Sequence, residues 1–143
     1  STDLVSRTLG MLAKEVKPGV TPLYLDKLAE QFIRDNMAFP AFKGLYGFPN
    51  TLCTSVNEQI VHGIPNDIPL VEGDIISIDC GTSINGYCGD QAFTFAVGEI
   101  SEEILFLFTR FSHSPSSFTN RVAKWQFICL PALDGSLVKS GSA

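Results

Sequence analysis

The stretch that decides the fold is IISIDCGTSINGYCGDQAFTFAV, residues 75–97. Two apolar, alternating runs flank Asn85-Gly86, and this dipeptide between such runs is the strongest short-range signal of a two-residue hairpin turn. Counting outward from that turn sets three pairs opposite each other: Ile84 with Tyr87, Ile78 with Phe93, and Ile76 with Phe95. The sequence therefore predicts an antiparallel hairpin with one face of aliphatic and aromatic side chains, fit for a core.

The other face of this hairpin carries two carboxylates. In the same register Gly81 lies opposite Asp90 and Asp79 lies opposite Ala92, so the aspartates are diagonal neighbours with Cβ atoms roughly 7 Å apart or a little less. Two carboxylates at that separation are candidate ligands for hard or borderline divalent cations. Acidic residues are also common on the solvent face of a hairpin, so both interpretations stay open. A slip of one residue would move Asp79 to the opposite face, so the inference depends on the turn.

Composition excludes several classes of protein. The chain has 143 residues, of which 45% are hydrophobic, enough for one domain with a core. A net charge of −5 argues against a nucleic-acid partner held by a basic face. No apolar run approaches the roughly 20 residues that cross a bilayer, so no membrane partner is expected. The four cysteines have no CxxC spacing, which favours reduced thiols and a cytoplasmic location.

Two helices are predicted before the hairpin. Apolar residues recur every three or four positions over residues 2–16, and the second helix has Thr21 as N-cap and Pro22 at its first position. That helix fades near Asn36. Both helices are most simply covers for a sheet.

Residues 38–50, AFPAFKGLYGFPN, are dense in glycine, proline and aromatic residues and are predicted to form a loop. Its rings either fold onto the core or, in the case of Phe42 and Phe48, line an apolar pocket. Short strands are predicted over residues 52–56 and 60–62. The second of these ends at a histidine, His62, which at such a position is more often structural than functional.

Five segments in order resemble type I methionine aminopeptidases: VKPGVTPLYLD (16–26), GLYGFPN (44–50), TLCTSVNEQIVHGIP (51–65), LVEGDIISIDCG (70–81) and GYCGDQAFTFAVGE (86–99). The resemblance covers nearly all of residues 4–100. It implies an α+β fold, the N-terminal half of a pita-bread fold, in which an antiparallel sheet is covered by two helices. Residues 1–100 would form this half, and residues 101–143 a divergent tail without family pattern.

The resemblance implies removal of the initiator methionine from nascent peptides by an enzyme with two divalent metal ions. Two cations about 3.5–4 Å apart can activate a water and polarise the peptide carbonyl. By resemblance Asp79 and Asp90 are metal ligands, and His62 is the catalytic histidine that contacts the scissile peptide. The residues lining the pocket for the methionine side chain would be Phe42, Phe48 and Cys53. Leu45 departs from the tyrosine common at its position, so the rim of that pocket is expected to differ.

The family needs one more histidine and two glutamates as ligands. His113 does not lie in a Gly-His-Gly loop, and the adjacent Glu102 and Glu103 cannot replace ligands from separate strands. We therefore expect a fragment that is inactive alone. A shifted reading frame, a truncated gene model or a fusion would each explain the change near residue 105. Before it, residues 102–108 are predicted to form one or two helical turns behind Ser101 as N-cap.

The metals could be cobalt, manganese, iron or zinc, since two aspartates do not select among them. The expected partners are peptides with an N-terminal methionine, including nascent chains at the ribosome. Two alternatives stay open: a non-catalytic binding module of the same fold, and a proline-specific peptidase relative. The segment SVNEQIVHGIP points away from the second.

Overall fold

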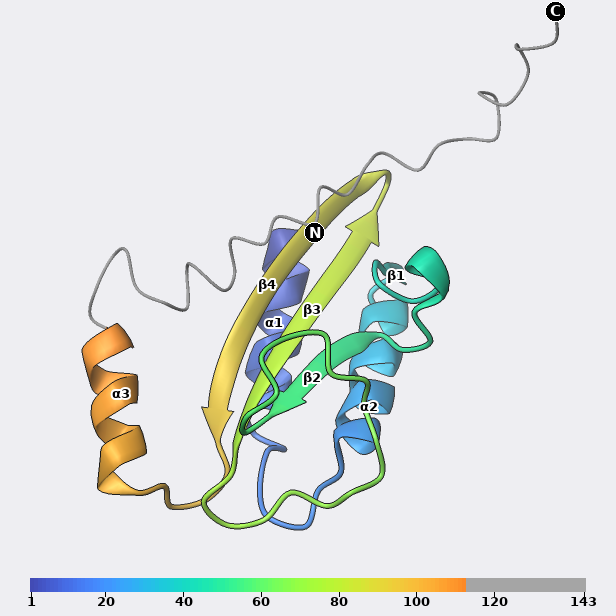
Figure 1. The fold of residues 1–143 in the computed structure, drawn as a ribbon. Coiled ribbons are helices and arrows are strands. Elements are labelled where there is room, and N and C mark those ends of the chain that lie inside the picture. Colours follow the sequence, from blue (N-terminus) through green and yellow to red (C-terminus); the bar gives the residue numbers. More distant parts are fainter. Residues whose placement is uncertain (113–143) are drawn as a thin grey trace, which may run out of the picture.

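Two helices lie under one face of an antiparallel sheet, and a third helix stands apart from it (Figure 1). The computed structural model describes residues 1–112, with side chains described through residue 107. In chain order the elements are α1 (Thr2–Leu12), α2 (Pro22–Asp35), β1 (Phe39–Pro40), a 3₁₀ turn (Leu45–Gly47), β2 (Leu52–Val56), β3 (Ile75–Ile84), β4 (Tyr87–Ala96) and α3 (Glu102–Ser112). This confirms the α+β class and the cover of two helices.

Strand β3 is the centre of the sheet. Strand β4 pairs with it along one edge, while β1 and β2 share its other edge. The predicted register is confirmed at all three pairs, Ile84 with Tyr87, Ile78 with Phe93 and Ile76 with Phe95. Asn85 and Gly86 have φ values of 50° and 81°, the two positive values that a type I′ turn requires.

The helices begin and end for local reasons. Helix α2 starts where the sequence predicts, because Thr21 Oγ1 accepts a hydrogen bond from the Tyr24 amide at 3.1 Å. Helix α1 ends at Leu12, earlier than the predicted residue 16, and the chain continues in turns toward Lys17-Pro18. Helix α3 begins behind Ser101 as predicted and runs on to Ser112.

The core lies between the helices and one face of the sheet. Its fully buried side chains include Val5 and Leu12 of α1, Leu25 of α2, and Ile76 and Ile78 of β3. The aromatic side of the predicted core face is only partly buried. Phe93 is 52% exposed, and its ring packs against Phe95 with centroids 4.9 Å apart. These rings stay partly exposed because β4 is an edge strand of the described sheet.

The predicted strand at residues 60–62 is wrong. This segment is a loop in which His62 has a φ of 59°, a left-handed conformation that interrupts an extended run. The next residue is hydrogen-bonded to β2, where the Thr54 amide donates to the Gly63 carbonyl at 2.8 Å. A Cβ on Gly63 would collide with the Thr54 carbonyl, so this approach requires glycine.

The predicted boundary near residue 100 falls just before α3 and stays a prediction. His113 and Cys129 lie outside the described residues. Among residues 1–112, no helix is long and apolar enough to cross a membrane.

Candidate metal and peptide site

Asp79 and Asp90 lie on the sheet face that points away from α1 and α2, which we call the carboxylate face. The register places Asp79 opposite Ala92 and Gly81 opposite Asp90, as predicted. Because alternate residues of a strand share a face, both aspartates point to the side opposite the buried Ile78. The Oδ1 atom of Asp79 is buried without a hydrogen-bond partner in the described structure.

The two carboxyl groups interact directly. The pKa of Asp79 is raised, first by burial, then by the negative charge of Asp90 and by a hydrogen bond with the Asp90 carboxyl group. Burial also raises the pKa of Asp90, although the hydrogen bond with Asp79 opposes this. Two carboxylates this close favour a shared proton, or a cation in its place. The orphaned Oδ1 atom and the raised pKa values therefore fit a divalent cation with oxygen ligands.

Further ligands are not at hand in the described part of the chain. Over residues 1–112, no group of three or more histidine, cysteine, aspartate or glutamate side chains could hold a metal ion. Two carboxylates supply fewer ligands than a closed site needs. The two aspartates would thus supply only part of the ligand set that a metal ion needs.

Phe42 and Cys53 both lie on the carboxylate face. The Phe42 ring is buried against Gly81, whose missing side chain leaves the space that the ring fills. Cys53 stands directly opposite Asp79 on the neighbouring strand and is 7% exposed. Burial, and secondarily the charges of Asp79 and Asp90, raise the pKa of the Cys53 thiol to about 12. The thiol therefore stays neutral and is a weak nucleophile, since only a thiolate is a strong one.

The structure connects His62 and Phe48 less directly to the carboxylate face. His62 is exposed, in the loop whose next residue, Gly63, donates its amide to Ser55 Oγ at 3.2 Å. Ser55 shares the face of Asp79, so this hydrogen bond fixes the loop at the rim of the carboxylate face. Phe48 is half-buried in its own loop, where its carbonyl accepts from the Gly44 amide at 2.8 Å. Their contacts with a peptide stay predictions.

The sequence-based reasoning missed a hydroxyl pair on the same face. Ser77 and Thr94 are opposite each other, with 2.7 Å between their hydroxyl oxygens. They lie two positions along from Asp79 and Ala92 and make the adjoining surface polar. The register itself contains this signal, because it puts the two hydroxyls on the face of the aspartates.

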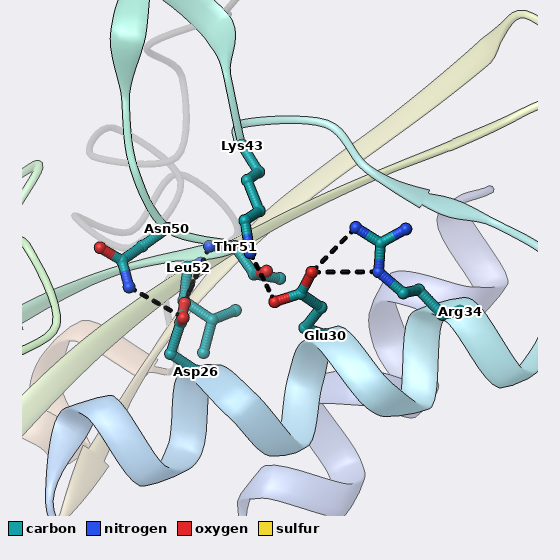
Figure 2. A network of polar contacts seen from close by, with 7 residues as sticks. All are labelled: Asp26, Glu30, Arg34, Lys43, Asn50, Thr51 and Leu52. Atoms are coloured by element: carbon teal, nitrogen blue, oxygen red, sulfur yellow. Dashed lines mark hydrogen bonds and ion pairs between the residues drawn. The ribbon is translucent and has the colours of Figure 1, made fainter.

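A carboxylate of α2, Asp26, was also missed (Figure 2). It is 3% exposed and accepts hydrogen bonds from the backbone amides of Thr51 at 2.9 Å and Leu52 at 2.8 Å. The Asn50 side chain donates a third at 2.9 Å. The sequence signal was an aspartate beside Leu25 on the apolar stripe of a helix, where a charge needs a partner.

The sequence of this chain is similar to those of known proteins. The profile described as metallopeptidase family M24 matches residues 1–113. The chain belongs to this family. A methionine aminopeptidase of Clostridium acetobutylicum is 58% identical over 101 residues, and one of Helicobacter pylori is 54% identical over 101 residues. These matches cover 70% and 71% of this chain but 40% of each relative.

Two solved structures share the fold of this chain. The methionine aminopeptidase of Rickettsia prowazekii superposes with a TM-score of 0.74 at 38% identity, covering 76% of this chain and 44% of that one. An Xaa-Pro dipeptidase of Bacillus anthracis superposes with a TM-score of 0.64 at 20% identity over 78% of this chain and 30% of that one, and so shares the fold alone. The chain has the pita-bread fold over the part these M24 proteins share with it, as predicted.

Proposed function

We propose that this chain is the N-terminal part of a methionine aminopeptidase and supplies one side of its metal and peptide site. The observation that carries the proposal is the pairing of Asp79 and Asp90 on one sheet face, with Phe42 and Cys53 beside them. The superposed methionine aminopeptidase of Rickettsia prowazekii is 38% identical, whereas the superposed dipeptidase is 20% identical, and two further methionine aminopeptidases are 58% and 54% identical in sequence over the matched region. The methionyl specificity is therefore favoured over proline specificity.

Each residue has a distinct part in the proposed reaction. Asp79 and Asp90 would hold two divalent ions, which supply Lewis-acid polarisation of the scissile carbonyl and activation of water. The neutral Cys53 thiol and the Phe42 ring offer an apolar, polarisable surface for a thioether side chain. His62 is proposed to contact the scissile peptide from the rim, and Phe48 to complete the pocket.

The chain spans 40% of the length of the curated relatives it matches. We propose that the remaining ligands, a histidine and two glutamates, belong to a second half of the fold and that the present chain is inactive alone. The proposed substrates are peptides with an N-terminal methionine, with nascent chains at the ribosome as their source. A cytoplasmic location, with cysteines in the thiol form, belongs to the same proposal.

Calorimetric titration of the full chain with Mn²⁺ or Co²⁺ tests the metal assignment. We expect weak binding by the wild type and at least about a tenfold loss in Asp79→Asn and in Asp90→Asn, since each removes one of two ligands. Asp67→Asn is the matched control, because Asp67 is exposed in the loop before β3. Metal binding that both site variants retain in full would contradict the assignment.

Activity and peptide binding test the rest of the proposal. With either metal the wild-type chain should not turn over a Met-Ala peptide, and turnover that Asp90→Ala abolishes would overturn the predicted inactivity. Binding of the peptide should require metal. Peptide binding of equal strength in EDTA would instead identify a non-catalytic binding module.

A further inference from the structure

Two acidic residues on one face of α2 fix both ends of the loop at residues 43–52, which we call the aromatic loop. Asp26 and Glu30 are four positions apart, so they lie one above the other on the helix. Glu30 Oε2 accepts from Lys43 Nζ at 2.7 Å, at the start of the loop. Asp26 accepts the amides of Thr51 and Leu52 at its end. Residues 43–52 are thus closed against a single helix (Figure 2).

The residues next to these two attachments are the pocket residues. Lys43 directly follows Phe42, whose ring covers Gly81. Leu52 directly precedes Cys53, which stands opposite Asp79. Since positions 79 and 81 are consecutive on the carboxylate face, the ring and the thiol are held at neighbouring places beside the two aspartates.

The two attachments differ in kind. The Asp26 contacts are buried and include backbone donors, so they stabilise the start of strand β2. The Glu30–Lys43 pair is part-exposed, with side-chain exposures of 23% and 40%. Glu30 also holds Arg34 at 2.8 Å within the helix. At the loop start the Ala41 amide also donates to the Gly81 carbonyl at 2.9 Å. The Glu30–Lys43 pair adds a side-chain contact there that can be removed without opening the core.

We propose that Asp26 and Glu30 are positioning residues for recognition of the methionine side chain, acting through Cys53 and Phe42. Asp26 fixes the thiol through the start of β2. Glu30 fixes the ring through Lys43. The proposal rests on the proposed function, because it assigns the pocket on the carboxylate face to a methionyl side chain.

Lys43→Met tests the proposal, with Arg34→Met as its matched control. Both changes remove one cation from Glu30, but only the first frees the loop. In the presence of Mn²⁺, we expect Lys43→Met to bind the peptide Met-Ala-Ser about fivefold more weakly than the wild type. Arg34→Met should bind as the wild type does, and Lys43→Arg should restore binding. Mn²⁺ affinity should stay unchanged in all three variants, which a general loss of structure would not allow.

Alkylation of Cys53 by iodoacetamide gives a readout that needs no peptide. Because the Phe42 ring lies next to Cys53 on the carboxylate face, loosening the ring should expose the thiol. Mass spectrometry should then show faster labelling of Cys53 in Lys43→Met than in Arg34→Met, with labelling of the exposed Cys88 unchanged. If the wild type does not bind Met-Ala-Ser at all, the proposed function fails, and faster labelling of Cys53 still supports the positioning. If Lys43→Met and Arg34→Met are labelled equally fast and bind the peptide equally well, the proposed positioning role is overturned.

Discussion

The Cε1 atom of Phe42 lies 2.6 Å from the point where a Cβ on Gly81 would stand. The ring occupies the side-chain position of a strand residue, two places along from Asp79 on the same face. The absence of a side chain at Gly81 is therefore what lets the Phe42 ring lie beside the carboxylate pair.

Gly81→Ala should displace the Phe42 ring and destabilise the chain by about 1–3 kcal/mol, as overpacking does in a filled site. Urea denaturation measures the change. Gly10→Ala is the control, since a Cβ there meets nothing within 4 Å and the residue is inside α1. It should stabilise the chain by about 0.5–1 kcal/mol. Equal effects of the two changes would mean that the ring does not fill the Gly81 site.

Thr21→Ala should destabilise the chain by about 1 kcal/mol, because the amide of Tyr24 loses its side-chain acceptor at the start of α2. Thr21→Ser keeps the hydroxyl and should stay close to the wild type. The midpoints of urea denaturation report both values. A serine variant as unstable as the alanine variant would assign the effect to the lost methyl group.

Glu30 should make the chain more stable above pH 4.5 than below it. Hydrogen bonds from Lys43 and Arg34 hold the pKa of Glu30 below its usual 4.5 in the folded chain. The unfolded chain therefore binds the proton first as the pH falls, and the stabilisation is lost as the pH passes through the folded pKa. Thermal melts from pH 3 to 7 should show the wild type above Glu30→Gln at neutral pH and the two converging in acid. A difference independent of pH would contradict this.

Asp79→Asn should stabilise the metal-free chain and remove its response to metal. In EDTA at neutral pH the variant no longer places two carboxylates together, and we expect a gain of at least about 1 kcal/mol. Added Mn²⁺ should raise the melting temperature of the wild type, since a ligand that binds only the folded state stabilises it, but not that of the variant. If Mn²⁺ leaves the melting temperature of the wild type unchanged, the result argues against a metal ion at Asp79 and Asp90.

Local signals account for what could be predicted. Asn85-Gly86 determined the hairpin and its register, and through the register the common face of Asp79 and Asp90. Thr21-Pro22 likewise determined the start of α2. In each case the residues that decide the structure are adjacent in the chain.

What could not be predicted depends on distant contacts or on unusual backbone. The left-handed conformation of His62 is not visible in a β-branched run, so the segment at 60–62 was wrongly predicted as a strand. The partners of Asp26 lie 24 to 26 residues further along the chain, beyond the reach of any helical pattern. Phe42 is buried, but on the carboxylate face and not in the core between the helices and the sheet, and its place in a pocket stays a prediction.

The loop closed by Asp26 and Glu30 has a consequence for protein engineering. Its tip, Leu45–Gly47, is exposed, with Tyr46 at 89%, while both ends are tied to α2. The exposed positions Leu45, Tyr46 and Pro49 can therefore be randomised, while Gly44 and Gly47, whose φ values of 88° and 82° favour glycine, and Phe48 are kept and the two attachments hold the flanking strand in register. A library confined to these positions would search for new side-chain selectivity at little risk to folding.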